Sequence, residues 1–224
     1  MNVEQARFNM IEQQIRTWNV LDASVLALLG QIKREDFVPT AHQALAFADM
    51  ELPLSNDADA CAKGHCMMAP KVEARMLQDA ALQPTDSVLE IGTGSGFMAA
   101  LLASKAQQVL TLEINPVFAE QARARLRAAG VSNVEVLETD GAYFQSVPMR
   151  FDAIVLSGSV AEIPHALLSM LKVGGRMCVI VGQEPVMQGT TITRMSQTDY
   201  RVVQSWDYCA ARLQHFAEPS RFQF

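Results

Sequence analysis

The stretch Val88-Leu89-Glu90-Ile91-Gly92-Thr93-Gly94-Ser95-Gly96 decides the fold of this chain. An apolar run of strand length enters three alternate glycines, and an apolar run of helical length follows them. Glycine adopts backbone conformations that other residues avoid, so such a turn lets a ligand approach bare backbone at the start of a helix. A glycine-rich turn between a strand and a helix is typical of nucleotide-binding α/β folds, although alone it is weak evidence.

The chain downstream of this turn alternates between strand and helix patterns. Strands are predicted at 87–91, 108–113, 134–138, 151–156 and 176–181, and helices at 96–106, 116–130 and 164–171, the last ended by Gly174-Gly175. This alternation predicts a parallel sheet. Residues 190–195 and 201–208 alternate across a turn at 197–199, which predicts an antiparallel hairpin at one edge. We therefore expect an α/β fold with a doubly wound, mostly parallel, seven-stranded sheet.

The chain upstream of residue 84 has a helical character and then an irregular one. Ile11, Ile15 and Trp18 share one helical face, and Asp22 is placed to cap a helix over 23–29 that Gly30 closes. Residues 37–70 lose the helical period apart from one short helix at 41–48. Pro70 then fits the first position of a further helix.

Composition and charge exclude several classes of protein. The 224 residues carry 18 Lys and Arg against 24 Asp and Glu, a net charge of −6, which disfavours nucleic acid as a partner. The longest stretch without charge, 91–104, is shorter than the roughly 20 residues of a membrane-spanning helix, so we expect no membrane partner. The N-terminus lacks a signal-peptide pattern, and four cysteines fit a reducing compartment. We therefore expect a cytoplasmic protein.

Acidic residues stand at three successive strand ends. Glu90 precedes the first glycine, where it would repel a pyrophosphate but could accept hydrogen bonds from a cationic amino-acid group. Glu113 ends the next strand, from which a carboxylate can hold both hydroxyls of a ribose. Asp140 follows the third strand and could accept an adenine amine, while Gly141 leaves room for the ring. Together they predict S-adenosylmethionine as cofactor, with S-adenosylhomocysteine as product, and make a nicotinamide enzyme the weaker alternative. The expected cofactor-binding residues are Glu90, Gly92, Thr93, Gly94, Ser95, Gly96, Glu113, Ile114, Asp140 and Gly141.

The chain resembles the protein-L-isoaspartate O-methyltransferase family of class I methyltransferases. The resemblance rests on Met10-Ile11-Glu12-Gln13-Gln14-Ile15-Arg16, Val25-Leu26, Arg34-Glu35-Asp36-Phe37-Val38-Pro39, Leu89 to Gly96, Asp140-Gly141, Phe151-Asp152, Ile163-Pro164 and Gly174-Gly175-Arg176. It covers roughly residues 5 to 182. Membership implies a Rossmann-like methyltransferase fold, S-adenosylmethionine, and methyl transfer to the abnormal carboxylate of isoaspartyl residues in damaged proteins, a repair reaction. We accordingly divide the chain into a helical extension, 1–83, that forms part of the substrate site, and a methyltransferase domain, 84–224, with a hairpin and tail from about residue 188.

One loop departs from the family pattern. The family reads Gly-Gln-Thr-Ile-Ser-Gln-Pro, and its Ser helps to hold the substrate carboxylate, whereas this chain has Gly64-His65-Cys66-Met67-Met68-Ala69-Pro70. Cys66 and Met68 thus replace the family's Thr and Ser, and His65 could donate to an anion in their place. These three are the candidate substrate-loop residues. Two alternatives to isoaspartyl methylation follow: a methyltransferase directed to another acceptor, including a small molecule, or a non-catalytic S-adenosylmethionine-binding interaction module.

Three further features have less specific interpretations. Cys61, His65 and Cys66 lie close in sequence but lack the spacing of a zinc site, so we expect no metal. Met67 and Met68 fit core packing better than an apolar substrate lining. The aromatic tail with Phe216, Phe222 and Phe224 could dock on the domain or on a second subunit, and the sequence leaves the oligomeric state open.

Overall fold

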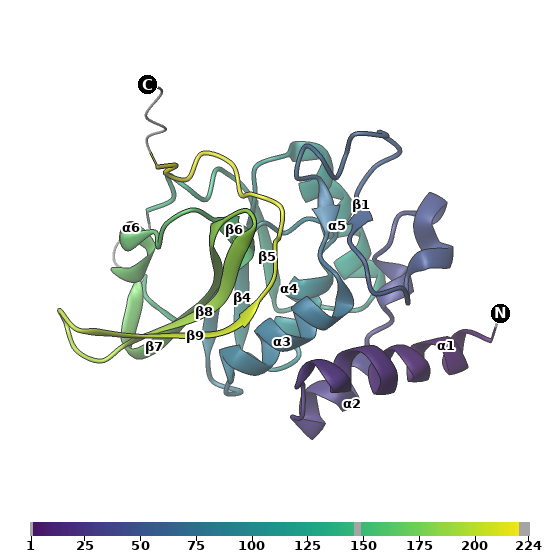
Figure 1. The fold of residues 1–224 in the computed structure, drawn as a ribbon, viewed down its shortest axis with the longest axis horizontal. Coiled ribbons are helices and arrows are strands. Elements are labelled where there is room, and N and C mark those ends of the chain that lie inside the picture. Colours follow the sequence, from purple (N-terminus) through teal and green to yellow (C-terminus); the bar gives the residue numbers. More distant parts are fainter. Residues whose placement is uncertain (1, 146–148, 220–224) are drawn as a thin grey trace.

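A seven-stranded sheet forms the centre of the molecule (Figure 1). The computed structural model describes residues 2–145 and 149–219. The sheet has the order β5-β4-β3-β6-β7-β8-β9. β3 to β7 run parallel, and β8 and β9 are each antiparallel to the strand before them. The bounds are β3 Ser87–Ile91, β4 Gln108–Glu113, β5 Val134–Glu138, β6 Phe151–Val160, β7 Leu171–Gln183, β8 Val186–Arg194 and β9 Tyr200–Asp207. The predicted seven-stranded, mostly parallel sheet is confirmed.

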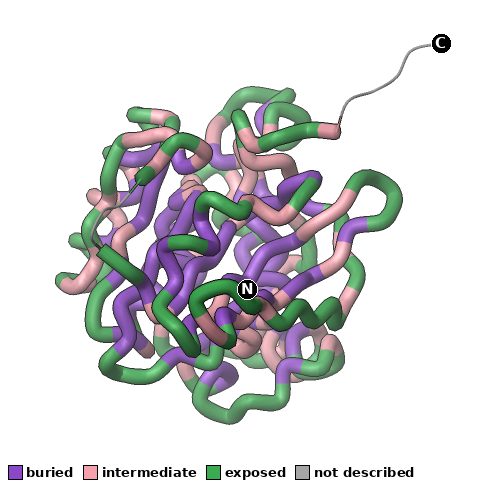
Figure 2. Tube along the Cα trace, turned by 90° about the vertical axis from the view of Figure 1, so that its left-hand side faces the viewer, coloured by how far each residue is buried: buried purple, intermediate pink, exposed green. Residues whose placement is uncertain are grey.

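Helices cover both faces of this sheet. Their bounds are α1 Val3–Asn9, α2 Ala23–Gln31, α3 Pro70–Ala80, α4 Phe97–Ala103, α5 Pro116–Ala128 and α6 His165–Leu168. Successive residues of a strand point to opposite faces, so Val88 packs with the core that includes α3, α4 and α5, whereas Leu89 packs with the core that includes α6. Because β3 is buried on both faces, its sequence does not alternate between apolar and polar residues. Figure 2 shows the buried chain gathered inside a shell of exposed segments.

Short elements complete the N-terminal third. A π-helical segment, Met10–Ile15, and a 3₁₀ turn, Arg16–Trp18, continue α1. Further 3₁₀ turns lie at Arg34–Asp36 and Thr40–Leu45, and β1 (Leu52–Pro53) pairs with β2 (Cys66–Met67). Residues of this third and of the sheet share one apolar core.

At two places the glycines that were predicted to end a helix do not end it. Gly30 lies inside α2 and does not close it, because the chain turns extended only at Ile32. Gly174-Gly175 does not end α6, which stops at Leu168. Instead, the two glycines lie within β7 at a bulge opposite Phe151 and Ala153. A Cβ on Gly175 would lie 2.9 to 3.1 Å from three backbone carbonyl oxygens, so this glycine allows two strands to approach closely.

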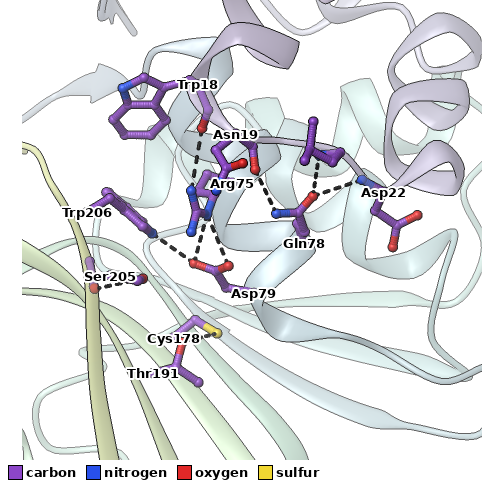
Figure 3. Close-up of polar contacts among 12 residues, drawn as sticks. Trp18, Asn19, Asp22, Arg75, Gln78, Asp79, Cys178, Thr191, Ser205 and Trp206 are labelled. Atoms are coloured by element: carbon purple, nitrogen blue, oxygen red, sulfur yellow. Dashed lines mark hydrogen bonds and ion pairs between the residues drawn. The ribbon is translucent and has the colours of Figure 1, made fainter.

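The predicted cap of α2 and the predicted start of α3 are confirmed, whereas the short helix predicted at 41–48 is the 3₁₀ turn Thr40–Leu45. α3 contacts both the residues before α2 and strand β9 of the hairpin. The Asp22 side chain accepts from the amides of Ser24 and Val25, and Pro70 opens α3. Figure 3 shows the junction. Gln78 of α3 accepts from the amides of Leu21 and Asp22. Asp79 accepts from the Trp206 indole of β9 at 2.8 Å.

Within the residues that the structure describes, every helix is too short or too polar to cross a membrane.

Candidate active site

A cavity opens at the carboxyl ends of the central strands. Chain order runs outward from β3 to β5 and then returns to β6 on the other side of β3, and ligands bind at such switch points. The cavity lies at this switch point. Its lining includes Leu54, Gly64, His65, Cys66, Ile91, Gly92, Gly94, Leu112, Glu113, Ile114, Asn115, Phe118, Thr139, Asp140, Gly141, Ser157, Arg212, Leu213, Gln214 and Phe216.

The glycine turn forms one wall of this cavity. Gly92, Gly94 and Gly96 have φ of 92°, 52° and 86°, a region that favours glycine. Gly92 and Gly94 line the cavity. Among the described residues, the lining does not include Thr93, Ser95 or Gly96, which make local contacts instead. Thr93 Oγ1 lies 2.7 Å from Thr111 Oγ1, and Ser95 Oγ accepts from the Phe97 amide. Gly96 is the residue before α4.

Glu113 brings a buried carboxylate to the cavity wall. Only 6% of the residue is exposed, and its two oxygens accept from the amides of Gly94, at 2.8 Å, and Asn115, at 3.0 Å. Burial raises the pKa of Glu113, and those two amide hydrogen bonds oppose the shift. Each carboxylate oxygen accepts more than one hydrogen bond, so capacity remains for a ligand hydroxyl. Ile114, which follows it, also lines the cavity.

Glu90 lies behind the cavity wall. It is fully buried and accepts hydrogen bonds from Thr111, at 2.6 Å, and Ser157, at 2.8 Å. Burial raises its pKa to about 8. Ser157 is itself part of the lining, so Glu90 reaches the cavity through the Ser157 hydroxyl.

Asp140 and Gly141, which follow β5 in the chain, line the cavity. Asp140 Oδ1 accepts from the Ala142 amide, and Oδ2 lies 2.5 Å from Nδ1 of His215. A Cβ on Gly141 would lie 2.3 Å from Ile91, so the glycine is required for packing against β3. Packing against Ile91 is thus a reason for a glycine at position 141 that the sequence alone did not reveal.

Two of the three candidate residues of the substrate loop line the cavity, and the third lies in the core. His65 and Cys66 line the cavity, and His65 packs edge-on against Phe118. Cys66 donates to Glu51, and burial beside that carboxylate raises the pKa of the thiol. Met68 is 6% exposed and points into the apolar core, while its carbonyl accepts from Arg34. The predicted core packing of Met67 and Met68 is therefore confirmed.

The C-terminal tail lies against the substrate loop, because a Cβ on Gly64 would come 3.3 Å from the Arg212 carbonyl oxygen. Ser159 of β6 pairs with Arg212 as in a parallel sheet, and the Leu213 amide donates to the Ser159 carbonyl. Leu213 then lies over the turn, because a Cβ on Gly92 would come 3.0 Å from its side chain. Phe216 docks on the same domain, while Phe222 and Phe224 lie outside the described residues. Sequence reasoning missed Arg212, Leu213 and Gln214, and the only signal was the aromatic character of the tail.

A wider cleft adjoins the cavity on the outer side of the tail and the loop. Its lining includes Glu51, Cys61, Lys63, Gln183, Glu184, Met187, Cys209 and Glu218. Gly64, Arg212, Leu213, Gln214 and Phe216 line both spaces. An inner cavity and an outer cleft that share one boundary can hold a cofactor and a second reactant next to each other.

Fold and cavity together define a class of protein. A buried acid at the end of β4, a glycine turn after β3 and an acid after β5 surround one cavity, which fits a ligand with a ribose and an adenine. The seven-stranded sheet with its antiparallel hairpin is the Rossmann-like fold of methyltransferases.

Comparison with known proteins narrows the class to a family. A sequence profile described as protein-L-isoaspartate(D-aspartate) O-methyltransferase matches residues 5–210. A Picosynechococcus protein-L-isoaspartate O-methyltransferase is 39% identical over 193 residues, 86% of this chain and 83% of that protein. A Koribacter versatilis relative of the same name is 37% identical over 84% of this chain and 81% of its own length. The chain belongs to the protein-L-isoaspartate O-methyltransferase family, so it is a methyltransferase.

A solved structure supports the fold. A Plasmodium falciparum protein described as a protein-L-isoaspartate O-methyltransferase, in complex with S-adenosyl-L-homocysteine, superposes with a TM-score of 0.78 over 96% of this chain and 99% of that one. The identity is 17%, so this likeness concerns the fold. The family match supports the predicted isoaspartyl methyltransferase and does not favour the two alternatives.

Proposed function

We propose that this protein methylates the abnormal carboxylate of isoaspartyl residues in damaged proteins, with S-adenosylmethionine as the methyl donor. The observation that carries the proposal is the buried Glu113 carboxylate, which faces a cavity between the glycine turn and Asp140 in a chain of this family. The unpaired cysteines among the described residues suit a reducing compartment, and we place the reaction in the cytoplasm.

The residues that would hold the cofactor follow from the cavity. Glu113 would accept both ribose hydroxyls, and Asp140 would accept from the adenine amine next to its contact with His215. Gly92 and Gly94 would offer bare backbone to the amino-acid part, and Glu90 would act on the same region through Ser157. When bound, S-adenosylmethionine supplies a methyl group on a positively charged sulfur. A carboxylate oxygen can attack the methyl carbon without help from a base, and the sulfur leaves as S-adenosylhomocysteine.

The chain's own residues then contribute placement and exclusion of water. A carboxylate is already a nucleophile, so rate comes from holding it in line with the methyl group in a dry site. Leu213 and Phe216 shield the boundary between the inner cavity and the outer cleft. The raised pKa of Cys66 keeps its thiol neutral, which fits a wall residue better than a nucleophile.

A matched pair of peptides tests the proposal. The protein is incubated with methyl-labelled S-adenosylmethionine and a peptide that contains one isoaspartyl residue, or the same peptide with ordinary aspartate. We expect base-labile label on the isoaspartyl peptide only. Label on neither peptide, from protein that binds S-adenosylhomocysteine, would contradict the proposed acceptor.

A further inference from the structure

The boundary between the inner cavity and the outer cleft contains one cationic side chain. Of the residues that the structure describes there, Gly64, Leu213, Gln214 and Phe216 are uncharged, and Arg212 is the exception. The outer cleft is otherwise rich in acids, with Glu51, Glu184 and Glu218 in its lining. An acceptor carboxylate that enters this cleft needs a positive partner at the boundary, because the acids repel it.

The substrate loop does not provide that partner. The side chain of Met68 is turned into the core, and the Cys66 thiol donates to Glu51. Lys63 lines only the outer cleft and pairs with Asp57 at 2.5 Å. His65 lines only the inner cavity, with its ring against Phe118.

The guanidinium of Arg212 is held in place and keeps donors available. Its Nη1 donates to the Gly182 carbonyl, at 3.0 Å, and to Ser159 Oγ, at 3.3 Å. Its Nε lies 2.9 Å from Glu218, a half-exposed residue of the tail. Within residues 2–145 and 149–219, Nη2 has no acceptor at hydrogen-bonding distance. The edge formed by Nε and Nη2 matches the two oxygens of a carboxylate.

We propose that Arg212 binds the carboxylate of the methyl acceptor and so takes the place of the loop hydroxyl that this chain lacks. Glu218 occupies one side of the same edge, and an entering acceptor carboxylate displaces it. Arg212 is thus a specificity-determining residue for the proposed reaction, and the inference rests on that proposed function.

The test separates peptide binding from cofactor binding. Arg212→Gln, Arg212→Lys and the wild type are compared for KM and kcat with the isoaspartyl peptide, and for S-adenosylhomocysteine affinity by calorimetry. We expect Arg212→Gln to raise the peptide KM by about 10- to 100-fold, because a charge-assisted pair is lost, with kcat and cofactor affinity changed by less than about threefold. Arg212→Lys, which keeps the charge but not the fork, should recover part of the loss.

A control variant removes a positive charge elsewhere. Arg201→Gln changes an exposed residue of β9. It should keep the wild-type KM. An equal rise in KM for Arg201→Gln would show a general charge effect and overturn the proposal, as would an unchanged KM for Arg212→Gln.

A structural role gives a different result. If Arg212 merely anchors the tail, its variants lose cofactor affinity in parallel with peptide KM, and that outcome overturns the proposal. Glu218→Gln provides a test in which Arg212 stays in place: we expect a peptide KM about two- to fivefold lower, and an unchanged KM would count against a shared edge. Wild-type protein that transfers no methyl group to the isoaspartyl peptide overturns the proposed function, and this inference with it, before any variant is compared.

Discussion

At the scale of single residues, the acids at the strand ends have different tasks. Glu113 faces the cavity with its carboxylate, whereas Glu90 supports Ser157 and Thr111 from behind the wall. The sequence spacing placed both near one turn but could not separate them, because the difference depends on Thr111 and Ser157, which belong to neighbouring strands. Both carboxylates are buried, and contact with the cavity is what separates Glu113 from Glu90.

Glu113 should dominate cofactor affinity. Replacing it by Gln keeps the shape but removes the negative charge that would accept two ribose hydroxyls, so we expect S-adenosylhomocysteine to bind about 10- to 100-fold more weakly. Calorimetry measures the dissociation constant. Glu120→Gln, an exposed residue of α5, is the matched control and should bind as wild type does. Equal affinity for the two variants would remove Glu113 from the cofactor site.

Glu90 should make the stability of the fold depend on pH. Its pKa is about 8 in the folded protein and about 4.5 in the unfolded chain, so between these values the folded state retains a proton that the unfolded state has released. The free energy of unfolding that this group contributes therefore falls as pH rises from about 4.5 to 8. Urea unfolding at several pH values should show a smaller decline for Glu90→Gln than for the wild type. Parallel curves for the two proteins would contradict the raised pKa.

At the scale of elements, the sequence predicted helices and strands well but predicted contacts between distant parts of the chain poorly. β3, β4 and β5 match their predicted bounds. β3 and most of β4 are buried, whereas β5 is a half-exposed edge strand in which Val134 and Val136 alternate with Glu135. The tail carries no such pattern, and its position depends on Ser159 and Gly158, which lie about fifty residues earlier. Arg212 was missed for this reason. The loop residues Cys66 and Met68 were found by resemblance, but only the structure shows that their side chains point in different directions.

Gly158 should control how the tail covers the cofactor cavity. A Cβ there would lie 2.8 Å from Leu213, which must then move from its place over the glycine turn. We expect Gly158→Ala to weaken S-adenosylhomocysteine binding several-fold, as measured by calorimetry. Gly30→Ala is the control, because its Cβ would meet nothing within 4 Å and α2 should gain about 0.5–1 kcal/mol of stability without a change in affinity. Normal cofactor affinity in Gly158→Ala would show that the tail position is unimportant for binding.

At the scale of the whole molecule, the first and last parts of the chain depend on each other. Trp18, before α2, meets Trp206 of β9 edge to face, with ring centroids 5.1 Å apart. Trp206 also donates to Asp79 of α3, and Lys71 of the same helix lies over the Trp18 ring. Figure 3 shows Arg75 and Asp79 of α3 between Trp18 and Trp206. The loop over 64–70 leads directly into the start of this helix.

A double-mutant cycle measures this dependence. Trp18→Leu and Trp206→Leu are each expected to lower the free energy of unfolding, and the double variant should lose less than the sum, with a coupling energy of about 0.5–1.5 kcal/mol for the aromatic pair. Urea unfolding followed by circular dichroism gives the four values. The cycle of Trp18 with Tyr200, at the other end of β9, is the control and should show coupling near zero. Additive losses for Trp18 and Trp206 would mean that the hairpin and the extension are stabilised separately. A measured coupling would mean that the segment before α2 and strand β9 stabilise each other across α3, which contacts both aromatic partners.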